Sequence, residues 1–210
     1  MSGRKDGGGI EEAARVGVVI LAAGGSTRMG RPKSLLGWRG RTILQAHLEA
    51  YAADGLDLVV VGGAEWERLL PICSPFGART IRNTRWASTH PVDSLRLALQ
   101  SQLREWSRCL VTPVDSPPVS SEDLRALLEA PVPSVLSYKG CPGHPVCLGT
   151  QEMHRLKHGN HSDVAGEVGS LRELLVDAEL LSSRRAEVLL NFNRPEDWNQ
   201  GEGADISYEQ

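Results

Sequence analysis

The stretch 21-LAAGGSTRMGRPKSLL-36 begins at the last residue of the apolar run 16-VGVVIL-21. It places three glycines, two arginines and a lysine directly after a segment that is typical of a buried strand. Backbone N–H groups in such a loop can approach an anion closely, because small residues leave no bulk in the way. The stretch therefore predicts either a phosphate-binding loop or a plain glycine-rich turn.

Neither of the two standard phosphate-loop motifs fits this stretch. A dinucleotide-binding fingerprint needs G-x-G-x-x-G, and the three glycines do not have that spacing. A GxxxxGK[ST] loop needs a lysine directly after its second glycine, but Arg31 and Pro32 separate Gly30 from Lys33. A third arrangement remains, in which small residues 22–26 expose their backbone to a triphosphate while Arg28 and Lys33 supply positive charge.

Short apolar runs alternate with amphipathic helical patterns along the rest of the chain. The further runs are 57-DLVVVG-62, 108-RCLVTPV-114, 134-SVLSY-138, 145-PVCLG-149 and 187-EVLLNF-192. Helical patterns occupy 41–54, 92–106 and 120–130. Alternation of this kind predicts an α/β protein with three layers, in which a mainly parallel, Rossmann-like sheet carries helices on both faces.

The helical patterns also contain candidate start signals. Thr42 can cap the first helix, and Ser120 with Asp123 has the S-x-x-D form of a capping box for the third. In the second pattern, leucines repeat every four residues from Leu95 to Leu103 behind Asp93 or Ser94. These signals predict helices that begin near residues 43, 94 and 121.

Length and composition describe an ordinary globular chain. It has 210 residues, of which 40% are hydrophobic and 23% charged, and a formal net charge of −3. We expect one domain over residues 15–198, with disordered tails at 1–14 and 199–210. The absence of a basic excess argues against a nucleic-acid partner. No apolar run of roughly 20 residues or signal-type segment is present, so we expect no membrane association and a cytoplasmic protein.

Cysteine and histidine spacings raise the alternative of a metal site. Cys141, His144 and Cys147 form C-x2-H-x2-C, but a closed zinc site normally has four ligands and no fourth is obvious nearby. His154 and His158 have helical i, i+4 spacing, whereas Gly159-Asn160 should end the helix before His161. Buried thiols and exposed helix-end histidines are the favoured interpretation.

Four segments, spread in order over almost the whole chain, carry a family resemblance. They are LAAGGSTRMGRPKSLL at 21–36, LVTPVDSPPVSSEDLRALLEA at 110–130, GHPVCLG at 143–149 and VLLNFNRPEDW at 188–198. They resemble, in turn, the motifs L-A-A-G-x-S-x-R-M-G-x-x-K-x-L-L, strand-Asp-x-Pro-helix, G-H-P-V and V-x-x-D-I-[DN]-T-P-E-D-Y. These motifs belong to the nucleotidyltransferases that include molybdenum cofactor cytidylyltransferase and guanylyltransferase, which share a fold with sugar-phosphate nucleotidylyltransferases.

The resemblance implies a reaction and a set of site residues. A nucleoside monophosphate would pass from a nucleoside triphosphate to a phosphorylated acceptor such as molybdopterin cofactor, with release of pyrophosphate. The implied nucleotide-binding residues are Leu21, Ala22, Ala23, Gly24, Gly25, Ser26, Arg28 and Lys33. Of these, Arg28 and Lys33 would act in catalysis together with Asp115, and His144 is expected near the acceptor.

Phosphoryl chemistry of this kind needs charge neutralisation more than covalent help, and Mg²⁺ suits it because magnesium prefers a few hard oxygen ligands. Asp115 at the end of an apolar strand is a natural ligand, and Asn193 stands where the family has its second metal-binding Asp or Asn. Asn191 lies two residues earlier along the same expected strand. Turn-forming Asp and Asn before prolines are the alternative for all three. The implied partners are a nucleoside triphosphate, with CTP favoured, the acceptor, and a molybdoenzyme or its chaperone.

The chain departs from the family pattern at two places. In 83-NTRWASTHPVDSLRLAL-99, Asn83, Trp86, Ser94 and Leu95 match N-P-x-W-x-x-G-M-x-S-S-L, but the glycine and one serine are missing. We therefore expect the preference for CTP over GTP to be modest. Asn191-Phe192 replaces the family's Asp-Ile, which removes a charge from the metal end. A non-catalytic nucleotide-binding accessory protein and a sugar-phosphate nucleotidylyltransferase thus remain as alternatives.

Overall fold

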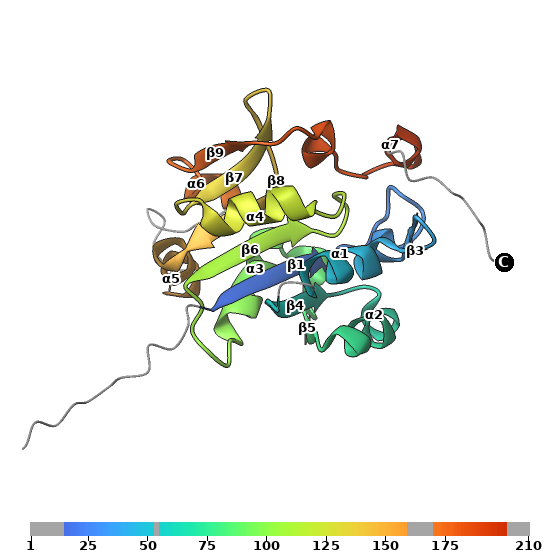
Figure 1. The fold of residues 1–210 in the computed structure, drawn as a ribbon. Coiled ribbons are helices and arrows are strands. Elements are labelled where there is room, and N and C mark those ends of the chain that lie inside the picture. The colour runs from blue at the N-terminus through green and yellow to red at the C-terminus, as the bar shows by residue number, and fades with distance from the viewer. Residues whose placement is uncertain (1–14, 53–54, 159–169, 201–210) are drawn as a thin grey trace, which may run out of the picture.

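A seven-stranded sheet runs through the part of the chain that the computed structural model describes, residues 15–52, 55–158 and 170–200 (Figure 1). Its strands are β1 (Val16–Ala22), β4 (Asp57–Gly62), β5 (Arg79–Arg82), β6 (Arg108–Pro113), β7 (Ser134–Tyr138), β8 (Cys141–Gly149) and β9 (Glu179–Ser182). They lie in the order β5-β4-β1-β6-β8-β7-β9, and β8 alone among these strands is antiparallel to its neighbours. The predicted mainly parallel sheet is confirmed.

Helices cover both faces of this sheet, which confirms the three predicted layers. They are α1 (Ile43–Ala52), α2 (Trp66–Cys73), α3 (Pro91–Gln100), α4 (Ser121–Glu129), α5 (Thr150–His158), α6 (Leu171–Leu174) and α7 (Pro195–Gln200). Alternate β1 residues divide between the two faces, since Val18 and Ile20 pack with α1, α2 and α4, whereas Val19 packs with α3 and α5. In Figure 1, α1 and α4 lie in front of the sheet.

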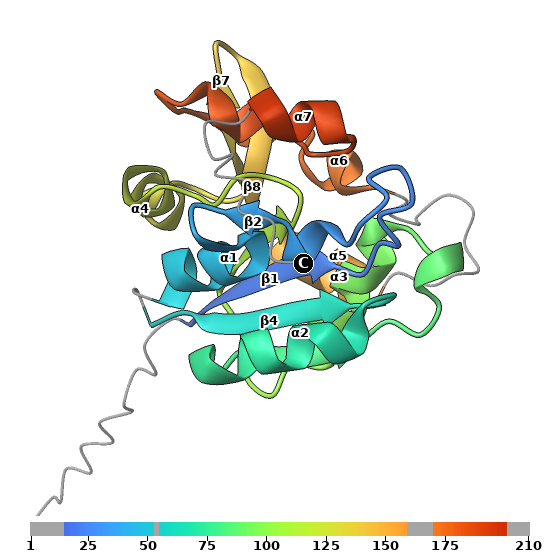
Figure 2. The same ribbon diagram turned by 90° about the vertical axis from the view of Figure 1, so that its right-hand side faces the viewer.

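The carboxyl ends of the central strands meet at one edge of the sheet. Leu21 pairs with Pro113 of β6, and Ala22 pairs with Gly62 of β4. The loop after β1 and the turn after β6 therefore leave the sheet side by side. A small hairpin, β2 (Gly37–Trp38) and β3 (Arg41–Thr42), and the helix α7 lie on the same side of the molecule, which Figure 2 turns toward the viewer.

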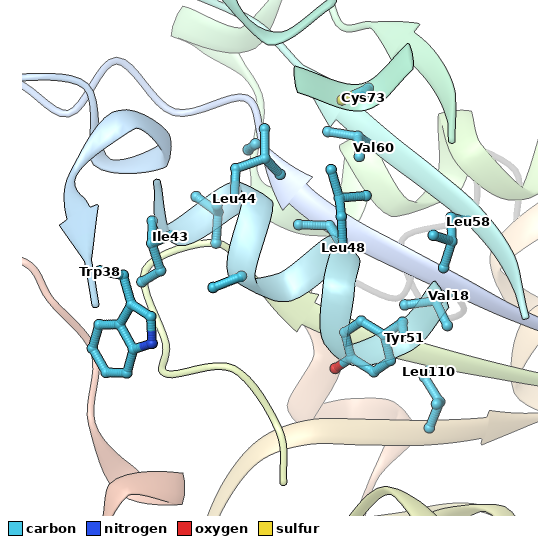
Figure 3. Packing of buried hydrophobic residues seen from close by; sticks show 14 of the residues in the cluster. Val18, Trp38, Ile43, Leu44, Leu48, Tyr51, Leu58, Val60, Cys73 and Leu110 are labelled. Atoms are coloured by element: carbon cyan, nitrogen blue, oxygen red, sulfur yellow. The ribbon is translucent and has the colours of Figure 1, made fainter. Parts of the chain in front are cut away.

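The core on the α1 face is formed by large apolar side chains with almost no exposure. Ile43, Leu44 and Leu48 of α1 belong to one cluster with Val18 and Val60 of the sheet, and Figure 3 shows Ile43 beside Trp38 and Leu48 nearer to the sheet residues. Burial of side chains of this size contributes about 1.5–3 kcal/mol each, so the α1–sheet contact is a major source of stability. It also places α1 directly beneath the edge where the strands end.

Two of the predicted helix starts are confirmed and one is wrong. Thr42 Oγ1 accepts a hydrogen bond from Gln45 N at 3.1 Å, and Ser120 Oγ accepts one from Asp123 N at 3.2 Å. The helix expected at 92–106, α3, begins after His90 rather than at Asp93 or Ser94, because the Asp93 carboxylate accepts the His90 backbone N–H at 2.8 Å. This helix ends at Gln100, and Leu103, which was expected on its apolar stripe, is 86% exposed.

The strand expected at 187–192 is also wrong. Residues Ala186–Leu189 form a short 3-10 helix, η4, and the extended backbone that follows is not part of the sheet. The apolar side chains of this run are packed in a different way, since η4 lies against β7 and β8 while Phe192 forms a cluster with Trp38 and Trp198. The strand at the sheet edge is instead the short segment β9, which pairs with β7.

Of the tails expected at 1–14 and 199–210, residues 1–14 and 201–210 lie outside the described residues, whereas Asn199 and Gln200 are the last residues of α7. The single-domain boundaries at 15 and 198 stay a prediction. Within the described ranges, no helix has the length and apolar character needed to cross a bilayer.

The loop after β1 is held against the sheet by an indole ring. A Cβ on Gly25 would lie 2.6 Å from Trp86 Cζ3, and a Cβ on Gly63 would lie 2.7 Å from Trp86 Cβ. Trp86 belongs to the 3-10 helix η3 (Trp86–Ser88). Its side chain lies between Gly25 and Gly63, two positions that have no side chain of their own. Because both ends of the indole are in contact, the ring cannot swing aside to accommodate a larger residue at position 25.

We predict that Gly25→Ala lowers the free energy of unfolding by about 1–3 kcal/mol, the usual cost of overpacking a filled site. Gly24→Ala is the matched control, since a Cβ at that position meets no atom within 4 Å. Its free energy of unfolding should stay within about 1 kcal/mol of the parent. Urea unfolding of the two variants checks this, and equal stabilities would show that Trp86 does not clamp the loop.

Candidate functional site

A cavity of about 370 Å³ opens at the edge where β1 and β6 end. Six segments line it: the loop after β1, the 3-10 helix η1 (Lys33–Leu35), the loop after β4 with Glu65, the end of β6 with Asp115, the turn before α3, and the segment that holds Asn193. The predicted residues found in its lining are Leu21, Ala22, Ala23, Gly24, Ser26, Arg28, Lys33, Asp115 and Asn193. Gly25 is not in the lining, because the Trp86 ring covers it.

Lys33 joins the two candidate metal ligands. Its Nζ donates to Asp115 Oδ2 at 2.6 Å and to Asn193 Oδ1 at 2.8 Å. The side chains of Lys33 and Asp115 are only 17% and 19% exposed, so their attraction is weakly screened by water. Asp115 and Asn193 follow Lys33 by 82 and 160 positions in the sequence, and both contact its ammonium group.

The backbone of the loop after β1 turns sharply at Ser26, which has a φ of 52°. The Ser26 hydroxyl accepts the backbone N–H of Lys33 at 2.9 Å, and this bond closes the loop over η1. Met29 is buried beneath the loop, whereas Arg28 is exposed where it lines the cavity. The loop therefore presents small residues and one guanidinium group to the cavity from a fixed backbone.

The turn that carries Asp115 is held by hydrogen bonds from two sides. The Asp115 carbonyl accepts the backbone N–H of Phe192 at 2.7 Å, and the Ser116 carbonyl lies 2.9 Å from Nε2 of His47 on α1. Burial lowers the pKa of His47 to about 4, against the opposing effect of its hydrogen bond to Ser116. Sequence reasoning missed His47, although a polar residue beside Leu48 on the apolar stripe of α1 was an available signal.

An aromatic cluster fixes Asn193. The rings of Phe192, Trp38 and Trp198 all contact one another, with centroids 5.8 Å apart for Phe192 and Trp38, 4.7 Å for Phe192 and Trp198, and 5.8 Å for Trp38 and Trp198. The Asn193 backbone N–H donates to Asp197 Oδ2 at 2.9 Å. Phe192, which stands where the family has isoleucine, thus packs in an aromatic cluster, and isoleucine could not fill that role in the same way. Asn191 is exposed, lies outside a strand and is not in the cavity lining.

The turn before α3 is organised by a buried amide. Asn83 donates to Thr89 Oγ1 at 2.9 Å and to Ser94 Oγ at 3.0 Å, and its carbonyl oxygen accepts the Arg85 N–H. Thr89 and Ser94 both line the cavity, as do Trp86 and His90. The segment that matches the family only partly is therefore a compact wall of the site.

The residues of the C-x2-H-x2-C spacing do not form a metal centre. Cys141 is exposed and Cys147 is buried, and no group of three potential metal-binding His, Cys, Asp or Glu side chains occurs in the described residues. Burial lowers the pKa of His144, while the negative charge of Asp115 works in the opposite direction. His154 and His158 stack with centroids 4.4 Å apart, and His161 lies outside the described residues.

Comparisons with known proteins agree with this geometry. Residues 18–179 match the model of the MobA-like NTP transferase domain. The chain is 32% identical to a nicotine blue oxidoreductase of Paenarthrobacter nicotinovorans, over 72% of this chain and 78% of that protein. It is 29% identical to a molybdenum cofactor guanylyltransferase of Xanthomonas euvesicatoria pv. vesicatoria (strain 85-10), over 87% and 92% of the two chains.

Among solved structures, Rv0371c of Mycobacterium tuberculosis H37Rv superimposes with a TM-score of 0.72 at 25% identity, covering 89% of this chain and 97% of that one. A cavity that combines a small-residue loop, two cationic side chains and a carboxylate suits a polyphosphate with a bound cation. The fold, the cavity and the matched segment lead to one conclusion: the chain belongs to the MobA-like NTP transferase family.

Proposed function

We propose that the protein transfers a nucleoside monophosphate, CMP, from CTP to a phosphorylated small-molecule acceptor of the molybdopterin type, with release of pyrophosphate. The observation that carries the proposal is the convergence of Lys33, Asp115 and Asn193 at one wall of the cavity beneath the loop after β1. Charge neutralisation and positioning are the main requirements of phosphoryl transfer, and these three side chains are suited to both.

The triphosphate would lie against the loop at residues 22–26, of which Ala22, Ala23, Gly24 and Ser26 line the cavity. Arg28 can bind two phosphate oxygens through its planar N–H groups, and the Lys33 ammonium can leave the Asp115 carboxylate for a more strongly charged triphosphate. These two cations would stabilise the charge that develops on the leaving pyrophosphate.

Asp115 and Asn193 would hold Mg²⁺. Their oxygens fit a single cation, because they already converge on the Lys33 ammonium at 2.6 and 2.8 Å. One carboxylate and one amide are enough protein ligands, since magnesium retains waters and also binds substrate phosphates. The ion would supply neutralisation of phosphate charge and polarisation of the phosphorus–oxygen bonds.

In the reaction, a phosphate oxygen of the acceptor attacks the α-phosphorus of the nucleotide. The bond between the new oxygen and the α-phosphorus forms as the bond from the α-phosphorus to the bridging oxygen breaks, and the electron pair leaves with pyrophosphate.

The wall formed by Trp86, Thr89, His90 and Ser94 restricts the cavity beside the loop. We favour a pyrimidine there because it is the smaller base. The guanylyltransferase relative makes GTP the competing donor. A cytoplasmic location and delivery to a molybdoenzyme or its chaperone accompany the proposal.

Pyrophosphate release tests the proposal directly. We predict release from CTP with Mg²⁺ and a molybdopterin-type acceptor, and a preference for CTP over GTP of about 10-fold, the size expected from one or two altered hydrogen bonds. Calorimetry with CTP, GTP, ATP and UTP measures binding of each base separately. Preference for GTP would replace the cytidylyl assignment with a guanylyl one. Nucleotide binding without any release would point to the accessory-protein alternative.

We predict that Lys33→Ala weakens CTP binding and lowers kcat by about 100-fold, because it removes a cation from the developing charge.

Asp115→Asn should abolish metal-dependent turnover while changing the melting temperature little. Lys157 and Glu105 form a matched pair outside the cavity, with 3.6 Å between Nζ and Oε1. Lys157→Ala and Glu105→Gln should leave turnover intact. Full activity in Lys33→Ala would mean that the loop is only a turn.

A further inference from the structure

A fully buried imidazole lies behind the turn that carries Asp115. His47 Nε2 is 2.9 Å from the Ser116 carbonyl oxygen. A carbonyl can only accept, so Nε2 carries the hydrogen and His47 is the donor. The other ring nitrogen, Nδ1, has no hydrogen-bond partner among the described residues. The hydrogen bond of the side chain is therefore made to the residue next to Asp115, and the backbone of Val114, on the other side of Asp115, also interacts with the imidazole.

Other bonds restrict the same turn. Ser116 Oγ donates to the Pro113 carbonyl at 2.8 Å, and Phe192 N donates to the Asp115 carbonyl at 2.7 Å. These hydrogen bonds occupy the Pro113 and Asp115 carbonyls, but they leave the Ser116 carbonyl without a partner from within the turn. His47 fills that position from α1, which lies 69 residues earlier in the sequence.

A polar side chain at this place is costly unless its bond is needed. His47 is surrounded by the apolar α1 core, where a leucine would bury without a desolvation cost. Without the imidazole, the Ser116 carbonyl would be a buried acceptor lacking a partner, because Ser116 is only 1% exposed. The turn could then rotate to reach water, and the Asp115 carboxylate would move with it.

We propose that His47 is a positioning residue of this site. Its Nε2–H holds the Ser116 carbonyl and thereby directs the Asp115 carboxylate toward the Lys33 ammonium and the metal that Asp115 would bind. The inference rests on the proposed function, because it assigns Asp115 as a metal ligand. It adds a residue that touches neither nucleotide nor metal but sets the direction of one that does.

Two substitutions with side chains of similar length separate the hydrogen bond of His47 from its packing. His47→Gln keeps an N–H donor at a similar reach, whereas His47→Met fills the space without a donor. Tyr51→Phe is the matched control, since Tyr51 is one helical turn further along α1, equally buried, and stacked on His47. Unfolding in urea measures the stability of each variant.

The readout is Mn²⁺ affinity, measured by electron paramagnetic resonance in the presence of α,β-methylene CTP. Loss of a residue that orients a metal ligand typically weakens metal binding by about 10- to 100-fold, and we expect this for His47→Met. His47→Gln should restore affinity to within about 3-fold of the parent, on the same scale of effects. Tyr51→Phe should not change it.

The outcomes are distinguishable. If Asp115→Asn binds Mn²⁺ as the parent does, the metal assignment fails and this inference fails with it. If Asp115→Asn loses Mn²⁺ but a folded His47→Met does not, His47 has no positioning role while the proposed function stands. Equal losses in His47→Gln and His47→Met would assign His47 to packing alone, which also overturns the inference.

A measurement on the parent protein covers the case in which His47→Met does not fold. Nitrogen-15 spectra of the imidazole should show the Nε2–H tautomer, with an Nε2 shift that moves when Mg²⁺ and α,β-methylene CTP are added. An Nδ1–H tautomer, or an Nε2 signal that does not respond to the ligands, would overturn the inference.

Discussion

The parallel pairing of β1 with β4 and β6 is the constraint on which the site depends. Because Leu21 lies opposite Pro113, the loop after β1 and the turn after β6 leave the sheet at the same level. Parallel strands end on the same edge, so groups that follow them in the sequence become neighbours in space. The contact between Lys33 and Asp115 is a direct result of this register.

Asn193 reaches the same place by a different route. The segment after β9 adds no strand to the sheet, and its position is set by the packing of η4 against β7 and β8, by the contact of Phe192 with two tryptophans, and by the hydrogen bond from the Phe192 N–H to the Asp115 carbonyl. One of those tryptophans, Trp38, is in the hairpin that follows η1. The two segments that supply Lys33 and Asn193 are therefore tied together by apolar contact as well as by their hydrogen bond.

A single carboxylate, that of Asp115, supplies the negative charge beside Lys33. Lys33 has a single carboxylate partner here, and the second contact is a neutral amide. An ammonium held by one carboxylate is more easily drawn toward a triphosphate than one held by two. The amide would also be a weaker ligand than a carboxylate for the magnesium ion that we propose, and the orientation of Asp115 would then be more important.

The sequence by itself determined the α/β class, the loop after β1 and nine of the nineteen residues that line the cavity, because these depend on local patterns such as apolar runs, small residues and caps. Ser120 and Thr42 act as the caps that local spacing predicts. Tertiary structure decided what local patterns do not contain. The apolar run at 187–192 resembled a strand, yet its first residues belong to η4, which packs against β7 and β8, and Phe192 joins an aromatic cluster. Leu103 matched a helical repeat but follows the end of α3. His47 became significant only because folding brings its Nε2 to a carbonyl 69 residues away, and the energy of that contact depends on distance in space, not on separation along the chain.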